Sequence, residues 1–136
     1  MELLHTYCKN AYNYNHTIKD PKSGYGSMTP EQVLHTMRGV LEGLHYLHTT
    51  TKICHGGLST SNVLITKVAA RKVSTWKVCL CDYNLRSLGI ESHSHKLRYL
   101  PPTTSIQNTP RGDLYSCSIM LWSCTRETTP LRERNG

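Results

Sequence analysis

The sequence predicts a single domain that is mainly α-helical and carries one small β-hairpin. Two segments, residues 29–49 and the stretch that begins at Asp113, repeat apolar side chains at helical spacing. Between them lie two short apolar runs, residues 63–65 and 77–81, which have the length and composition of strands. A chain of 136 residues holds at most one such domain, which can bury roughly two thirds of its unfolded surface without disulfides.

Charge and composition argue against nucleic-acid binding, a membrane segment and secretion. Lysine and arginine number 16 against 9 acidic residues, a net charge of +7, but they are scattered along the chain. Because nucleic-acid recognition uses clustered basic side chains, we predict no nucleic-acid binding. There is no run of 18 apolar residues, and the N-terminal sequence lacks the pattern of a secretory signal. We therefore expect a cytoplasmic protein without a membrane segment, with an irregular segment at 9–28 and a flexible tail at 125–136.

The first predicted helix begins with a capping box. Thr29 supplies the cap hydroxyl, Pro30 suits the first turn, and Gln32 lies three residues after the cap. We expect the helix to stop near Thr49 and its whole apolar face to be covered. That face consists of Val33, Leu34, Met37, Val40, Leu41, Leu44 and Leu47.

Histidines and cysteines do not predict a metal centre. His45 and His48 lie one helical turn apart, but no carboxylate or further histidine completes a site nearby in the sequence. The six cysteines form no C-x-x-C pair, so we read them as reduced thiols. Cys79 and Cys81 share one face of the second predicted strand, and we expect both to pack in the core. The second helix is apolar nearly all round from Asp113, which predicts a buried helix.

The segment between the first helix and the first strand carries the most informative motif. It reads Cys54-His55-Gly56-Gly57-Leu58-Ser59-Thr60-Ser61-Asn62, and His55, Leu58 and Asn62 fall in register with the catalytic loop H-R-D-L-x-x-x-N. The chain therefore resembles a protein kinase. The resemblance continues in order with Tyr46-Leu47-His48, Cys81-Asp82-Tyr83-Asn84-Leu85 for D-F-G-L, Arg98-Tyr99-Leu100-Pro101-Pro102-Thr103 for R-Y-L-A-P-E, and Gly112-Asp113-Leu114-Tyr115-Ser116 at the start of the central helix.

The resemblance implies a kinase C-lobe from about the interlobe hinge to the central helix, with the N-lobe absent from the chain. Residues 1–136 would be a partial kinase-like domain, and the Tyr-Ser pair is similar to tyrosine-kinase and tyrosine-kinase-like members. The glycine-rich phosphate loop, the strand lysine and its glutamate partner belong to the missing lobe.

Departures from the family pattern fall on the catalytic positions. Gly57 occupies the place of the aspartate that accepts the substrate proton, and Gly56 that of the arginine that pairs with a phosphorylated activation loop. Asn84 replaces the glycine of D-F-G, and Thr103 replaces the anchoring glutamate. No catalytic set is therefore intact.

Other matching positions imply binding or structural roles. Asn62 and Asp82 match the magnesium ligands of the family, although both residue types also commonly close loops and turns. His55 and Tyr83 correspond to members of the stacked hydrophobic spine, and Asp113 to the residue that accepts catalytic-loop N–H groups. Leu64, together with Met120 and Cys124, corresponds to the column that packs under adenine, which makes Leu64 a possible adenine contact. Without the analogy, these would be ordinary core residues.

The combined expectation is a catalytically inactive kinase-like fragment, a pseudokinase that acts by binding another protein. That partner could be a kinase N-lobe or a kinase, and no cofactor is expected for this chain, whereas the family uses ATP and Mg²⁺. The alternative is the C-lobe part of an ATP-dependent protein kinase whose N-lobe lies outside the chain. A third interpretation is an incomplete product with no independent role.

Overall fold

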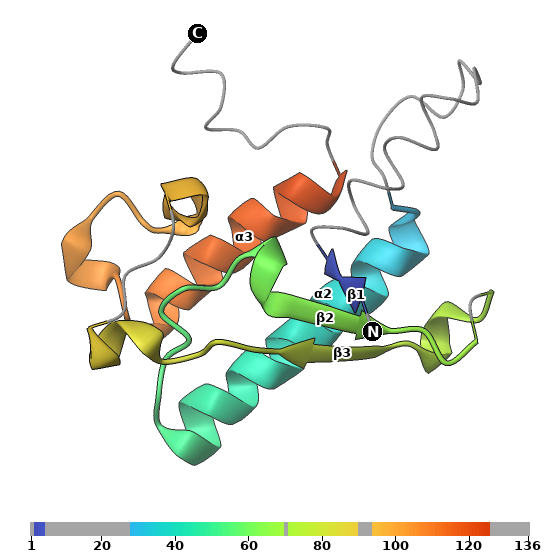
Figure 1. The fold of residues 1–136 in the computed structure, drawn as a ribbon, viewed down its shortest axis with the longest axis horizontal. Helices are drawn as coiled ribbons and strands as arrows, with labels where there is room; N and C mark the ends of the chain where they lie inside the picture. The colour runs from blue at the N-terminus through green and yellow to red at the C-terminus, as the bar shows by residue number, and fades with distance from the viewer. Residues whose placement is uncertain (1, 5–27, 70, 90–93, 126–136) are drawn as a thin grey trace, which may run out of the picture.

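The computed structural model describes residues 2–4, 28–69, 71–89 and 94–125. The predicted irregular segment 9–28 and tail 125–136 lie outside these residues, apart from Met28 and Thr125. Two long helices, α2 (Pro30–Tyr46) and α3 (Pro110–Thr125), lie side by side, and α2 passes behind a small sheet (Figure 1). The fold is mainly α-helical with a small antiparallel sheet, as the sequence predicts.

The sheet has three strands instead of the two that the sequence predicts. β2 (Val63–Thr66) and β3 (Lys77–Leu80) form the expected antiparallel hairpin, with Leu64 opposite Cys79. A third strand, β1 (Glu2–Leu3), pairs antiparallel with β2, so that the order is β1-β2-β3. Sequence periodicity cannot reveal a strand of two residues, because alternation needs at least four.

The α2 helix begins as predicted and ends at Tyr46, three residues before the predicted end near Thr49. The Thr29 hydroxyl accepts from the Gln32 backbone N–H at 3.2 Å, and the Gln32 side chain accepts from the Thr29 N–H at 3.0 Å, which completes the capping box. After Tyr46 the helix widens into a π-helical turn, Leu47–Thr51, and Lys52 terminates it in a left-handed conformation.

The apolar face of α2 is covered only in part. Val33, Met37, Val40 and Leu44 are buried in the core, but Leu34 and Leu41 keep 72% and 45% of their surface exposed. The expectation that the whole face is covered was wrong, because the stripe is wider than the sheet and α3 that pack against it. Leu34, Leu41 and their neighbours line an open apolar groove of about 520 Å³.

Close contact between α2 and β3 depends on two glycines. A Cβ atom on Gly39 would lie 2.6 Å from Cβ of Val78, and one on Gly43 would lie 2.9 Å from Cδ1 of Leu80. Val78 and Leu80 therefore point at the helix, and Cys79 on the opposite face of β3 is exposed. The prediction that Cys79 packs in the core was wrong, because the helix covers the other face of the strand.

The α3 helix starts three residues before the predicted start at Asp113 and is buried on one side only. Its buried residues are Gly112, Asp113, Ser116, Cys117, Met120 and Cys124. Leu114, Leu121 and Trp122 remain 51%, 43% and 41% exposed. The prediction of a helix buried all round was wrong, because among the described residues only α2 and the 3-10 segment Ser94–Tyr99 make extensive contact with it.

The core lies between the sheet and the two helices. β2 directs Val63 and Ile65 into it, while Leu64 between them is only half-buried. Trp76, in the loop that connects the two strands of the hairpin, is 4% exposed, and its indole N–H donates to the Ala69 carbonyl. Within the described residues, no helix is long and apolar enough to cross a membrane.

Candidate functional site: a glycine-substituted catalytic loop

The catalytic-loop match runs from the end of the π-helical turn to the start of β2, and His55 is its buried centre. The imidazole has no exposed surface, and its Nε2 lies 3.0 Å from the Cys81 carbonyl oxygen. The His55 carbonyl accepts from the Asn84 N–H at 2.9 Å. These two contacts join the loop to the segment 81–85 that matches D-F-G-L.

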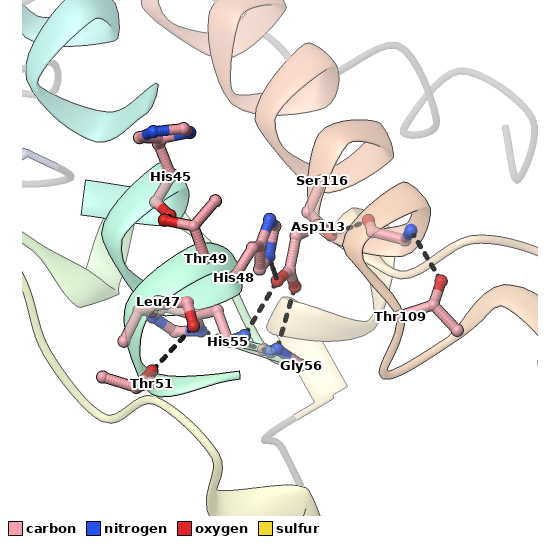
Figure 2. Close-up of polar contacts among 12 residues, drawn as sticks. His45, Leu47, His48, Thr49, Thr51, His55, Gly56, Thr109, Asp113 and Ser116 are labelled. Carbon is pink, nitrogen blue, oxygen red and sulfur yellow. Dashed lines mark hydrogen bonds and ion pairs between the residues drawn. The ribbon is translucent and has the colours of Figure 1, made fainter. Parts of the chain in front are cut away.

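Asp113 holds the loop against α3. Its carboxylate is 2% exposed and accepts the backbone N–H groups of His55 at 2.8 Å and Gly56 at 2.9 Å. Figure 2 shows both bonds reaching from the first turns of α3 to the loop. Asp113 thus lies where the family resemblance places the residue that accepts loop N–H groups.

His48 is a third partner of the Asp113 carboxylate. Nε2 of His48, on the π-helical turn, lies 2.7 Å from Oδ2 of Asp113. The sequence predicts no carboxylate near His48, and that was wrong, because the two residues are 65 positions apart and only the fold brings them together. His45 points away from this carboxylate (Figure 2).

Gly56 and Gly57 keep the path of the loop without the side chains of H-R-D. Gly56 has a φ of +74°, a left-handed value that glycine adopts at no steric cost. The Gly57 N–H donates to Nδ1 of His55 at 3.3 Å, and its carbonyl accepts from the Asn62 amide nitrogen at 2.8 Å. The loop is therefore closed by its own hydrogen bonds, and the catalytic-base position carries no proton acceptor.

The segment that follows β3 is held in an unusual backbone conformation. Asp82 and Asn84 have φ values of +56° and +62°, a region in which Asp and Asn are more common than other non-glycine residues. Tyr83 is 48% exposed. The kinase resemblance predicts a core position for it, and so does the interpretation that it is an ordinary apolar residue. That expectation was wrong, because Tyr83 lies in the turn beyond β3 and the core ends before it.

Asn62 and Asp82 have the donor types that Mg²⁺ prefers. The Asn62 amide nitrogen is engaged by Gly57, so only the amide oxygen of this side chain could ligate a cation. Asn62 is 3% exposed, whereas Asp82 is exposed. Magnesium in such sites usually keeps waters and substrate phosphates as its remaining ligands. The two residues fit the ion in kind, and a triphosphate would have to supply the other ligands.

The residues matched to the adenine column divide between two faces of β2. Met120 and Cys124 of α3 have no exposed surface and belong to the core with Val63 and Ile65. Leu64 is half-buried on the opposite face of the strand. A ligand could therefore touch Leu64, whereas Met120 and Cys124 would support the strand from below.

Burial controls the protonation of the groups around Asp113. Desolvation lowers the pKa of His55, although the nearby Asp113 carboxylate opposes this shift. Desolvation, and then Asp113, raise the pKa of the Cys54 thiol and bring that of Cys117 to about 11. At neutral pH these groups are a neutral imidazole and protonated thiols, so neither cysteine is activated as a nucleophile.

The contacts of Tyr99 with the loop and with α3 could not be predicted from the sequence. The Tyr99 hydroxyl lies 3.1 Å from the Thr60 hydroxyl of the loop, and the Tyr99 carbonyl accepts from Ser116 of α3 at 2.6 Å. Tyr99 thereby joins the R-Y-L-P-P-T segment to both the loop and the helix. The position of Tyr99 within the motif is the only signal for this role, and the motif alone says nothing of its partners.

Comparison with known proteins agrees with this geometry. The sequence pattern of the protein kinase domain matches residues 1–136, so the chain belongs to the protein kinase domain family. It is 32% identical over 119 residues to human "Interleukin-1 receptor-associated kinase-like 2", covering 81% of this chain and 19% of that protein.

Two further relatives are more distant. The identity is 26% over 102 residues to "Probable leucine-rich repeat receptor-like protein kinase IMK3" of Arabidopsis thaliana, covering 74% of this chain and 13% of that protein. The identity to mouse "SCY1-like protein 2" is 26% over 114 residues, covering 71% of this chain and 12% of that protein. The chain is thus a kinase-domain fragment that spans a fifth or less of each relative.

Proposed function

We propose that this kinase-domain fragment is a pseudokinase, which transfers no phosphate and acts by binding another protein. The observation that carries the proposal is Gly57. Glycine replaces the loop aspartate that accepts the proton of the substrate hydroxyl in active members of the family. In general, assistance of this kind accelerates a reaction by about 10²- to 10⁴-fold, equivalent to about 3 to 5 kcal/mol of transition-state stabilisation.

The hydrogen bonds of the loop favour the interpretation that the loop is an intact but inactive scaffold and not part of a disrupted fold. His55, Gly56 and Gly57 remain bound to Asp113 and to the loop itself, although two of the three residues have lost their family side chains. Asp113 is 2% exposed beneath the loop, so the loop keeps a buried anchor. We interpret the loop as a structural element that supports a binding surface.

Exposed apolar side chains support a protein partner. Leu34 and Leu41 line the groove on α2, and Leu114, Leu121 and Trp122 lie exposed on α3. Apolar surface that stays exposed in a groove or patch commonly marks an interaction site. A kinase N-lobe or a complete kinase domain is a candidate partner. We also propose a cytoplasmic location for the protein.

The alternative function is that of the C-lobe part of an ATP-dependent protein kinase. Asn62 and Asp82 favour it, because both retain oxygen donors of the kind that binds Mg²⁺. In that case ATP and Mg²⁺ would be cofactors of a longer protein, whereas for this chain alone we propose none. Gly57 speaks against the alternative, since a complete N-lobe would still not provide the missing base.

Phosphate transfer tests the proposal. The purified chain is incubated with ATP labelled at the γ-phosphate, Mg²⁺ and generic protein substrates, and we expect no transfer above a heat-inactivated sample. Asp82→Ala is the matched control, because it removes the carboxylate that would hold Mg²⁺. Transfer by the wild-type chain that is lost in Asp82→Ala would overturn the proposal in favour of the alternative.

A further inference from the structure

A cluster of three metal-ligating side chains lies beside the loop, and the kinase resemblance assigns no metal to it. His48 comes from the π-helical turn, Cys54 from the start of the loop and Asp113 from α3. One potential ligand atom of each, a histidine nitrogen, the cysteine sulfur and a carboxylate oxygen, lies within 4.8 Å of the other two. The π-helical turn and the loop, six residues apart at His48 and Cys54, therefore direct a nitrogen and a sulfur at the same point as the carboxylate oxygen of the distant Asp113.

We propose that His48, Cys54 and Asp113 form a binding site for a single zinc ion. Zinc is bound in proteins by histidine nitrogen, cysteine sulfur and carboxylate oxygen in tetrahedral geometry. Magnesium and calcium prefer oxygen ligands throughout, so a site with nitrogen and sulfur donors discriminates against them. Three protein ligands leave the fourth position for a water molecule.

The geometry requires only small movements. Bond lengths of about 2.0 to 2.3 Å in a tetrahedron place ligand atoms roughly 3.3 to 3.7 Å apart. Nε2 of His48 and Oδ2 of Asp113 are now 2.7 Å apart and would separate slightly. The sulfur of Cys54 lies within 4.8 Å of the other two atoms and would approach them by at most about 1 Å, within reach of a side-chain rotation.

The carboxylate is already held in place by neighbours that a zinc site needs. Oδ1 of Asp113 accepts from the Gly56 N–H at 2.9 Å, and Oδ2 accepts from the His55 N–H at 2.8 Å. Hydrogen bonds of this kind orient a metal ligand before the ion arrives. The side chain of His48 is 16% exposed and Cys54 is half-buried, so an ion can enter from solvent.

Charge also balances in the proposed complex. On binding, Cys54 gives its thiol proton to solvent and its sulfur forms the bond to zinc, while His48 binds as neutral imidazole with its proton on Nδ1. The thiolate and the Asp113 carboxylate together neutralise the two positive charges of the ion. The site would join the end of α2, the loop and α3, and so stabilise the fold.

Zinc-dependent thermal stability and cobalt absorption test the site in the full chain, freed of metal with a chelator. We expect one Zn²⁺ per chain and a rise of several degrees in Tm, with no rise from Mg²⁺. Cys54→Ala and His48→Gln should each weaken binding more than about 10-fold, since even the loss of outer partners commonly costs that much. Cys79→Ser and His45→Gln, which lie outside the cluster, should bind as the wild type does.

The absorption of Co²⁺ bound to the wild-type chain tests the site even if a variant fails to fold. Co²⁺ bound to the wild-type chain should show the near-ultraviolet charge-transfer absorption of a thiolate ligand, and Cys79→Ser should retain it. Absence of this absorption in the wild type, or its persistence in folded Cys54→Ala, would overturn the proposal. Zinc binding that survives His48→Gln unchanged would do the same.

Discussion

At the scale of single residues, one buried carboxylate joins most of the elements of the site. Asp113 accepts hydrogen bonds from His55, Gly56 and His48, which belong to the loop and to the end of the first helix. A buried acceptor with three donors is costly to remove, because the donors lose their partner without regaining water.

Asp113→Ala should therefore lower the stability of the chain by at least about 3 kcal/mol, since each unsatisfied buried donor costs about 1 to 3 kcal/mol. Urea unfolding measures the loss, and failure to obtain folded protein counts as its extreme. Glu42→Ala is the control, because Glu42 is an exposed acid whose ion pair with Arg38 contributes only about 0.3 to 0.5 kcal/mol. Equal losses in the two variants would contradict the anchoring role.

The two glycines of the loop should respond differently to substitution. Gly56→Ala places a side chain at a φ of +74°, which costs an L-residue about 1 to 2 kcal/mol. Gly57 does not have a positive φ, so Gly57→Ala should be neutral or slightly stabilising. Denaturation midpoints of the two variants compare them directly. A Gly57→Ala that is less stable than Gly56→Ala would refute the assignment of strain to Gly56.

At the scale of elements, the distance between α2 and β3 is set by glycine. Gly39→Ala gains helix propensity of about 1 kcal/mol, but its Cβ would lie 2.6 Å from the Cβ of Val78, which cannot move without the strand. We expect a net loss of about 1 to 2 kcal/mol.

Gly43→Ala is the matched comparison on the same helix. Its Cβ would meet only the end of the Leu80 side chain, at 2.9 Å, and that side chain can rotate away. We expect Gly43→Ala to be neutral or stabilising, as measured by thermal unfolding. Stabilisation by both substitutions would show that the helix and strand are not in close contact.

The elements also show what the sequence could and could not reveal. The capping box at Thr29 predicts the start of α2, because that signal is local. Leu34 and Leu41 belong to the same apolar stripe as Val40 but are exposed, since periodicity reports which face is apolar and not what covers it. Likewise, the position of Cys79 depends on which face of β3 meets the helix, and alternation alone leaves that choice open.

Some residues of the site are indicated by local sequence motifs, whereas others come together only in the tertiary structure. The motif around His55 and the start of α3 carries the resemblance to kinases, and it places Asp113 near the loop. His48 and Cys54 join the carboxylate through tertiary structure, 65 and 59 positions away in sequence, so no local pattern indicates the cluster. Sequence reasoning considers His48 with His45, the neighbour along the helix, and that pair does not converge on Asp113.

At the scale of the whole molecule, the chain combines a complete loop scaffold with exposed apolar surface. The loop, the hairpin and both long helices form one core, while Leu121 and Trp122 of α3 and Leu34 of α2 remain exposed. The chain spans 19% of the human relative. Phosphoryl transfer requires groups that position a triphosphate and neutralise its charge, and a loop scaffold alone provides neither.

The central claim, that this kinase-family chain keeps the loop scaffold without holding a nucleotide for transfer, is tested most directly by restoring the missing loop residues. The variant that combines Gly56→Arg with Gly57→Asp rebuilds His-Arg-Asp, and its Tm is measured with millimolar ATP and Mg²⁺ and again with ATP and EDTA. A ligand raises Tm only when its concentration is comparable to or above its Kd, and we predict no difference between the two conditions. A clear rise in Tm with ATP and Mg²⁺ that EDTA abolishes would contradict the claim.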